Sequence, residues 1–367
     1  MRRAMFLGLG LAAAASASAA VAHQAVALVA PAPAPGFDLA EGKRAVAVLA
    51  EELERTFVFP DVARRYAARL RERLADGAYD RAADAAALAT MVTEDLQAVA
   101  PDGHLKMRPP LPAAAEGEPA RRRVYPDPME QAGWIADGVA YVRFNAFLGS
   151  AQQVADFEAF LDGHEGARTL IIDARTHHGG GLSEMDVLFP RIFTEPRTVM
   201  VMDTRASVAA EEGGLPFDSL VQVSAPAELH RAEHRVVPRS ERSAWADTRI
   251  FLLTSGRTAS AGEHLATVLK ETGRATLIGD TTAGAGNYGG GIDLPGGYDA
   301  FIPVGHSYFP GKQGWEGVGV TPHIAVAPER ALVEALVRSG VSAQQAEALS
   351  ASHVPGEPMV RRRPLRS

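Results

Sequence analysis

The stretch Phe251-Leu-Leu-Thr-Ser-Gly-Arg-Thr-Ala-Ser260-Ala-Gly-Glu-His-Leu-Ala-Thr-Val-Leu-Lys270 decides the fold of this chain. It opens with a continuous apolar run, which is typical of a strand that is covered on both faces, as in a parallel sheet. Thr254-Ser-Gly256 breaks the run, and apolar residues then recur at helical spacing as far as Gly273, a residue suited to end a helix. The pattern predicts a buried strand, a sharp turn and a helix.

Ser260 falls at the start of the predicted helix, just beyond the strand. The first N–H groups of a helix have no partner within the helix, and the helix dipole is positive at that end. Negative charge that develops beside Ser260 would therefore be stabilised. A serine in this place can be a nucleophile or a simple helix cap, and position alone leaves both interpretations open.

Composition limits the classes of function. The 367 residues are enough for a sizeable core and two domains. A net charge of −7 with mixed signs gives no basic surface for nucleic acid. The chain has no cysteine, which excludes disulfides, a lipid-anchoring cysteine, a cysteine nucleophile and thiolate metal sites.

The N-terminus has the pattern of a secretory signal. Met1-Arg2-Arg3 is followed by a short apolar run and by small-residue cleavage sites near Ala19 and Ala22. We expect a signal peptide over residues 1–22 and an Ala/Pro-rich linker over 23–37. The apolar run is too short for a confident membrane span, so the sequence predicts a periplasmic or secreted protein without a membrane anchor after removal of the signal.

Residues 38–108 are predicted to form an N-terminal helical subdomain. Three apolar stripes recur at helical spacing and are separated by Pro60 and Gly77. Their members are Val46, Leu49, Ala50 and Leu53; Val62, Tyr66, Leu70 and Leu74; and Leu88, Met91, Val92, Leu96 and Val99. A Pro/Ala-rich break follows over residues 109–118.

Residues 125–330 alternate between strand and helix patterns, which predicts an α/β core with a mostly parallel sheet. The expected strands are 139–144, 169–173, 198–202, 250–253 and 275–278, and one helix carries Val154, Phe157, Phe160 and Leu161. Residues 204–245 show no clear period and are interpreted as an irregular insertion that covers a cleft. Residues 331–367 are expected to form a C-terminal helix and a basic tail.

Several motifs together resemble the tail-specific (C-terminal processing) protease superfamily. They are Val58-Phe-Pro60, Asp102-Gly-His104-Leu, Asp173-Ala-Arg-Thr-His-His-Gly179-Gly-Gly181, Thr254–Glu263, Gly273–Thr282 and Trp315-Glu316-Gly-Val-Gly-Val-Thr-Pro322. They occur in the family's order over residues 40–330. The resemblance is to the branch with tricorn-protease core domains and interphotoreceptor retinoid-binding modules. It implies a crotonase/ClpP-like α/β core with an N-terminal helical subdomain.

The resemblance also implies a set of catalytic residues. Ser260 corresponds to the nucleophile, which needs a base within hydrogen-bond reach. The lysine that serves as base in the related processive proteases would fall at Ala285, so that pair is absent. In the tricorn-like branch the base is a histidine, which falls on His104, and the residue that orients it is a glutamate, which falls on Glu316.

The oxyanion hole implied by the resemblance consists of the backbone amides of Ala261 and Gly180. The chain departs from the family at Gly103, where a serine is usual, and at His177-His178, where asparagine and proline are usual. The segment between His104 and Val139 is short for a PDZ module. The expected substrate is a peptide or protein, with no metal or cofactor, and the sequence does not predict the oligomeric state.

Other interpretations stay open. His230-Arg-Ala-Glu-His234 matches the spacing of inverted zinc proteases, although a chance match on a solvated helix explains it more simply. An α/β-hydrolase triad could use Ser260, Asp293 or Asp299, and His323, which would make the chain an esterase. A third possibility is a carrier of a small hydrophobic ligand on the same fold, in which Ser260 is vestigial.

Overall fold

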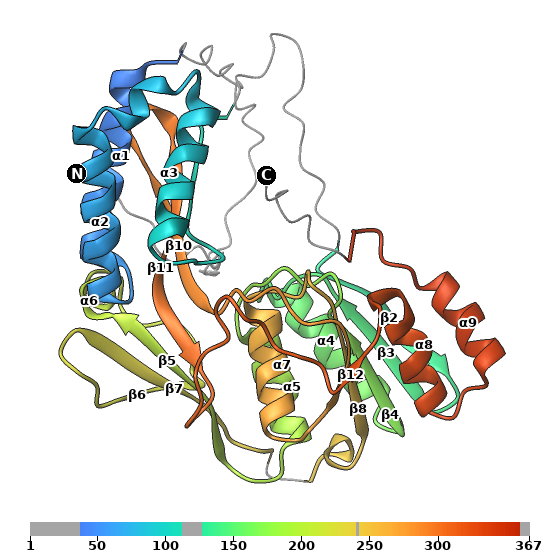
Figure 1. Cartoon of the computed structure of the whole chain (residues 1–367). Coiled ribbons are helices and arrows are strands. Elements are labelled where there is room, and N and C mark those ends of the chain that lie inside the picture. Colours follow the sequence, from blue (N-terminus) through green and yellow to red (C-terminus); the bar gives the residue numbers. More distant parts are fainter. Residues whose placement is uncertain (1–36, 112–126, 240–241, 360–367) are drawn as a thin grey trace, which may run out of the picture.

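The computed structural model describes residues 37–111, 127–239 and 242–359 (Figure 1). The expected signal peptide, all but the last residue of the expected linker, most of the Pro/Ala-rich break and the basic tail lie outside these residues. None of the described helices is both long enough and apolar enough to cross a membrane.

The N-terminal part is helical, as the three apolar stripes predict. It contains α1 (Leu39–Thr56), α2 (Pro60–Ala75), the short 3-10 helix η1 (Ala78–Arg81) and α3 (Ala85–Val99). The Asp38 carboxylate caps α1 by accepting hydrogen bonds from the N–H groups of Ala40 and Glu41. Pro60 stands in the first turn of α2, where its missing N–H costs no hydrogen bond.

A mostly parallel sheet forms the centre of the molecule, and this prediction is confirmed. Its strand order is β12-β9-β8-β4-β3-β2, and every neighbouring pair is parallel except β2 with β3. The strands are β2 (Met129–Ala136), β3 (Val139–Phe144), β4 (Thr169–Asp173), β8 (Arg249–Thr254), β9 (Thr276–Gly279) and β12 (Ile324–Ala325). The expected strands in this sheet therefore lie within one residue of their predicted bounds.

Helices cover both faces of this sheet, which explains why its strands are apolar throughout. One face carries α4 (Ala151–Gly163), α5 (Ser183–Ile192) and α7 (Ala261–Glu271), and the other carries α8 (Pro328–Arg338) and α9 (Ala343–Ser352) (Figure 1). Along β4, for example, Ile172 packs in the core of the first face and Ile171 in the core of the second.

A second sheet, antiparallel and six-stranded, corrects the interpretation of residues 204–245 as an irregular insertion. It consists of β1 (Lys106–Arg108), β5 (Arg197–Arg205), β6 (Leu220–Val223), β7 (Leu229–Val236), β10 (Asn287–Asp293) and β11 (Asp299–Tyr308). The remaining elements are α6 (Ala206–Glu212), η2 (Ala244–Ala246) and η3 (Pro295–Gly297). Most of the segment is thus regular structure, in which β6 and β7 extend the sheet from β5.

The expected helix at His230-Arg-Ala-Glu-His234 is wrong, because these residues lie in β7. A spacing of four residues places both histidines on one face of a strand as well as of a helix. Glu233 lies at an odd position between them and points to the opposite face, where its carboxylate accepts hydrogen bonds from Thr198 and Arg235. The zinc-protease pattern is therefore not assembled.

The hairpin β10–β11 joins the two parts of the molecule. It runs from the α/β core up along α1 and α3 (Figure 1), and Ile292, Ala300 and Ile302 are buried in the same hydrophobic cluster as the N-terminal helices. β1, which follows α3, pairs with β11. The helices are therefore packed on a hairpin from the far end of the sequence, and this packing fixes the loop that carries His104.

Candidate active site

Ser260 lies in a strained turn between β8 and α7. Its backbone has φ +54° and ψ −119°, whereas a residue that caps a helix is normally extended with negative φ. Non-glycine residues with positive φ are uncommon, and a sharp strand-to-helix turn of this kind presents the nucleophile in other serine hydrolases. The conformation distinguishes Ser260 from an ordinary cap.

Glu263 fixes this turn from within the first turn of α7. Its fully buried carboxylate accepts four hydrogen bonds: from the N–H of Ser260 at 3.0 Å, from Thr282 Oγ1 at 2.5 Å, and from the N–H groups of Gly284 and Ala285 at 2.7 and 2.8 Å. Burial raises the pKa of Glu263, and these donors act against that shift. The carboxylate thereby ties the Ser260 turn to the loop 282–285.

The glycine-rich loop after β4 lies beside Ser260. Because β4 and β8 are parallel neighbours, the loops that follow them leave the same edge of the sheet. Gly179 and Gly180 have φ of +121° and +134°. A Cβ on Gly179 would lie 2.9 Å from Ser260 Cβ, and a Cβ on Gly180 would lie 1.9 Å from the carbonyl oxygen of Phe147. Both positions require glycine.

Two backbone N–H groups next to Ser260 have no protein acceptor within the described residues. The Ala261 amide is the first of α7. The Gly180 amide lies opposite Phe147, but the two hydrogen bonds to Phe147 are formed by the carbonyl of Gly179 and the N–H of Gly181. Unpaired amides that border a serine hydroxyl can bind a developing oxyanion. These are the two amides that the sequence resemblance implies.

A buried ion cluster anchors the glycine-rich loop. Asp173, at the end of β4, accepts hydrogen bonds from Arg175, Arg143 and Tyr141. Burial alone would raise the pKa of Asp173, but Arg175 and Arg143 outweigh it and hold that pKa well below its ordinary value. The charge is thus compensated, so its role is to position the loop.

His104 lies in the loop between α3 and β1, where Asp102 organises the backbone. The Asp102 carboxylate accepts hydrogen bonds from the N–H groups of His104 and Leu105 at 2.8 and 3.0 Å, and from the side-chain amide of Asn287 at 2.8 Å. The imidazole of His104 stacks on Phe301 of β11, with ring centroids 5.1 Å apart. Two elements distant in sequence therefore hold this histidine.

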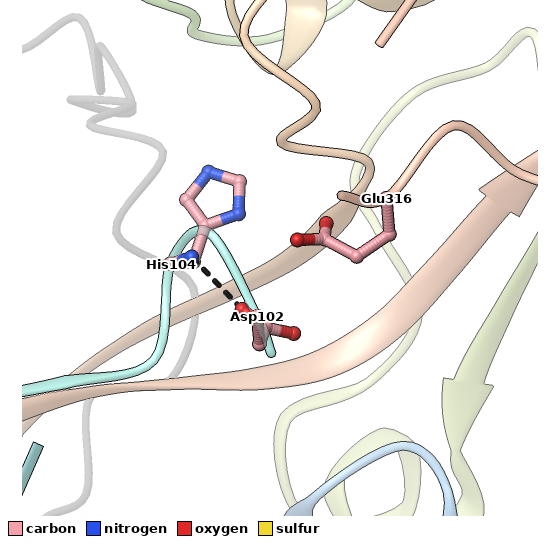
Figure 2. Close-up of side chains that lie close together, drawn as sticks. All are labelled: Asp102, His104 and Glu316. Atoms are coloured by element: carbon pink, nitrogen blue, oxygen red, sulfur yellow. Dashed lines mark hydrogen bonds between the residues drawn. The ribbon is translucent and has the colours of Figure 1, made fainter. Parts of the chain in front are cut away.

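The Glu316 carboxylate is turned toward the His104 imidazole (Figure 2). It accepts hydrogen bonds from the N–H groups of Gly103 and Gly286, both at 2.6 Å, and of Asn287 at 2.8 Å. Burial raises the pKa of Glu316 to about 7, and the charge of Asp102 adds to the shift. The sequence resemblance gave Glu316 the role of orienting the histidine but gave Asp102 none.

Asp102, His104 and Glu316 could also be considered as metal ligands, because one ligand atom of each lies within 4.8 Å of the others. The carboxylates, however, already accept five N–H groups of the backbone and one of Asn287. Those hydrogen bonds suit two carboxylates that shape a histidine loop better than a cation site.

The loop 284–286 connects the His104 group to the Ser260 group. Gly286 donates to Glu316, whereas Ala285 donates to Glu263 behind Ser260. A Cβ on Gly103 would lie 3.2 Å from Glu316 Oε1 and 3.7 Å from the Cα of Ala285. Ala285 and Gly286 line the pocket that contains Ser260. His104 and Ser260 thus border the same loop.

The pocket beside Ser260 has a volume of about 50 Å³. The walls include side chains from the second sheet, from α7 and from the segment that the sequence analysis placed over the cleft. They include Leu182, Met202, Leu215, Phe217, Tyr288 and Trp315, with His264, Ser307 and the Gly180 and Ala261 backbone. Leu215 and Phe217 show that part of the segment 204–245 does reach this pocket.

The α/β-hydrolase alternative is not assembled. His323 lies beside β9, where its Nδ1 accepts a hydrogen bond from the N–H of Leu277. Asp299 forms an ion pair with Arg108 beneath the helical part. Neither of them, nor Asp293, is among the residues that line the Ser260 pocket.

Some residues of the site were missed by the sequence analysis. Glu263 had a signal, since Ser260 and Glu263 match the capping-box spacing. Asp102 stood inside a quoted motif without a role. Asn287, His234 and Asp186 had no local signal, because each acts on residues of other elements.

A family model described as peptidase family S41 matches residues 138–326, just over half of the chain. The chain belongs to this family. A second model, the N-terminal domain of peptidase S41 in eukaryotic IRBP, matches residues 40–133. The two matches cover the helical part and the α/β core, and they confirm the tail-specific protease superfamily that the motifs indicated. The chain is thus a member of a serine-type peptidase family.

Two individual proteins are similar to this chain, one in sequence and one in fold. A carboxyl-terminal-processing protease of Picosynechococcus sp. is 25% identical over 211 residues, which are 58% of this chain and 44% of that protein. The chain therefore spans less than half the length of this curated relative. The solved structure of a photosystem II D1 C-terminal processing protease superposes with a TM-score of 0.51 and 15% identity, over 84% of this chain and 97% of the other. This second likeness concerns the fold.

Proposed function

We propose that this S41 protein hydrolyses peptide bonds through an acyl-enzyme. Ser260 Oγ attacks the carbonyl carbon, and His104 takes the hydroxyl proton and later gives it to the leaving amine. Glu316 orients the imidazole and stabilises its protonated form. The amides of Ala261 and Gly180 bind the oxyanion. A water molecule then attacks the acyl-enzyme ester, with His104 again as the base, and releases the carboxylic acid product and free Ser260.

The conformation of Ser260 is the observation that carries this proposal. A positive φ at a serine costs free energy of about 1–3 kcal/mol, and such strain persists where the surrounding structure enforces it. Here a buried carboxylate enforces it, and the resulting turn exposes the hydroxyl next to two amides that have no acceptor among the described residues. A serine that only capped a helix would need neither feature.

A carrier of an apolar ligand is the other function that the fold admits. The pocket argues against it, because sites for small organic ligands commonly have volumes of about 300–1,000 Å³, whereas the pocket beside Ser260 has about 50 Å³. A cavity of this size accepts a short side chain rather than an extended hydrophobic molecule. We therefore favour the enzyme.

The proposal includes export from the cytoplasm. The basic start Met1-Arg2-Arg3, the short apolar run and the small residues up to Ala22 support a cleaved signal, and the absence of cysteine means that the chain needs no disulfides there. An N-terminus of the exported protein near residue 23 would support this part of the proposal, and recovery of the intact chain in the cytoplasm would contradict it.

Labelling with a fluorophosphonate probe tests the catalytic residues. Phosphonylation of Ser260 Oγ displaces fluoride and needs the same base and the same amides. We expect labelling of the wild type, none with Ser260→Ala, and a decrease of at least about 100-fold in rate with His104→Ala. His323→Ala is the matched control and should label as the wild type does. A folded wild type that stays unlabelled would contradict the proposal.

A further inference from the structure

Three ionisable side chains form a line that ends at the Ser260 pocket. Asp186 of α5, His234 of β7 and His264 of α7 are joined by two hydrogen bonds: Asp186 Oδ1 lies 3.1 Å from His234 Nε2, and His234 Nδ1 lies 3.1 Å from His264 Nε2. Both histidines are nearly fully buried, with exposed fractions of 1% and 3%. His264 borders the pocket. The proposed catalytic mechanism uses none of the three.

The line uses one ring nitrogen of His264 and leaves the other for the pocket. The Asp186 carboxylate accepts, so His234 must carry its proton on Nε2. His234 Nδ1 pairs with His264 Nε2, so this nitrogen of His264 is taken up within the line. The Nδ1 atom of His264 is left to bind a molecule in the pocket, and a hydroxyl group, which both donates and accepts, can pair with it.

His264 stays neutral, because burial and the adjacent His234 lower its pKa well below the ordinary value. Its Nδ1 forms no hydrogen bond to the described residues. This atom is also not one of the unpaired polar atoms that are fully buried. The atom is thus reachable by a molecule in the pocket. A polar ring atom at a pocket whose walls are largely apolar favours a ligand that brings a hydrogen-bonding group.

We propose that His264 selects a small hydroxyl side chain on the residue whose carbonyl Ser260 attacks, so that the peptide is cut after serine or threonine. This inference rests on the proposed peptidase function. The volume of about 50 Å³ sets the size, since one water needs about 10–15 Å³ by this measure and the cavity therefore holds a side chain of about three or four heavy atoms. The walls, including Leu182, Met202 and Phe217, suit its aliphatic part.

The test compares peptidyl diphenyl phosphonates that differ only in the side chain entering the pocket. In each, Ser260 Oγ forms a bond to phosphorus, phenoxide leaves and the base takes the hydroxyl proton. Serine is paired with 2-aminobutyrate, which has the same shape without the hydroxyl. For the wild type we expect serine to label about tenfold faster, the effect of one hydrogen bond to the polar ring atom of His264.

In His264→Leu the serine probe should lose this advantage, while the 2-aminobutyrate probe keeps a rate within a few-fold of the wild type. Asp186→Asn provides a second variant that preserves the shape of the core. It removes the carboxylate that holds His234, so His264 is oriented less firmly and the serine probe should lose part of its advantage over 2-aminobutyrate.

The outcomes separate the two proposals. Equal rates for serine and 2-aminobutyrate in a wild type that labels well would overturn the role of His264 and leave the peptidase intact. An equal loss for every probe in His264→Leu would also overturn it, since His264 would then act on the chemistry itself. A wild type that reacts with no phosphonate and no fluorophosphonate would remove the peptidase function and this inference with it.

Discussion

The Glu316 carboxyl group lies where burial and a neighbouring charge both act against ionisation. The pKa of Glu316 is about 7 in the native protein, whereas it is near 4.5 in the unfolded chain. Between these two pH values, the native protein therefore holds a proton that the unfolded chain has already released. Three backbone N–H groups limit the shift but do not reverse it. The group that we propose to orient His104 thus lowers the stability of the fold when it ionises.

Glu316→Gln should change how stability depends on pH. In the wild type this carboxyl lowers the free energy of unfolding as pH rises from about 4.5 to 7, by at most about 3 kcal/mol, and contributes no further change above or below. We expect the difference in urea midpoint between pH 5 and pH 8 to shrink in Glu316→Gln, whatever its stability at pH 5.

Glu329→Gln, which changes an exposed carboxylate in the first turn of α8, is the control and should retain the dependence of the wild type. A Glu316→Gln variant with the full wild-type dependence would show that Glu316 is already ionised at pH 5 in the native protein.

At the scale of elements, α7 and the loop 282–285 are joined through one side chain. Glu263 accepts four hydrogen bonds, and three of the donors are backbone N–H groups. Its removal would free the Ser260 turn and the loop that leads to Glu316 at the same time. Among the described residues, no other side chain accepts a hydrogen bond from the N–H of Ser260.

Glu263→Gln should therefore lose both stability and labelling. The glutamine amide would turn donors toward N–H groups that need acceptors, at a cost of about 1–3 kcal/mol for each group left unpaired. We expect a decrease of about 2–4 kcal/mol in the free energy of unfolding and slower fluorophosphonate labelling of the folded fraction. Glu271→Gln, at the opposite end of α7, should change stability by less than about 0.5 kcal/mol. Labelling at the wild-type rate in Glu263→Gln would refute the role of this carboxylate.

The sequence correctly predicted the helices that bury one apolar stripe and the strands that are buried on both faces, because such burial leaves a clear pattern of apolar residues. α1 to α3 and β3, β4 and β8 belong to this class. β7 was missed because its charged residues form cross-strand pairs, such as Arg231 with Asp203, and because its two histidines fit a helical spacing equally well. The histidine line at the pocket could not be predicted, since α5, β7 and α7 meet only in the folded chain.

At the scale of the whole molecule, the proposed catalytic groups come from two regions that share one core. The cluster under the N-terminal helices includes Leu49 of α1 and Leu96 of α3 together with Ile302 of β11. The same hairpin supplies Asn287, which binds Asp102, and Phe301, which stacks on His104. The position of His104 therefore depends on the hairpin as much as on the helices, and the boundary predicted near residue 108 does not mark the end of a separate core.

This shared core predicts that the helices and the α/β core unfold together. All three tryptophans, Trp134, Trp245 and Trp315, lie outside the N-terminal helices, and the chain has no cysteine, so a dye on Arg65→Cys in α2 reports on the helices alone. We expect the dye signal and the tryptophan fluorescence to change at the same urea concentration.

Ile302→Ala, which removes a fully buried side chain from the shared cluster, should lower both midpoints together and decrease the free energy of unfolding by about 2–5 kcal/mol. Val221→Ala, at a partly exposed position of β6, should move neither. A dye transition that precedes the tryptophan transition would instead show that the helices open on their own, and His104 would then be the mobile partner of a site whose Ser260 half stays folded.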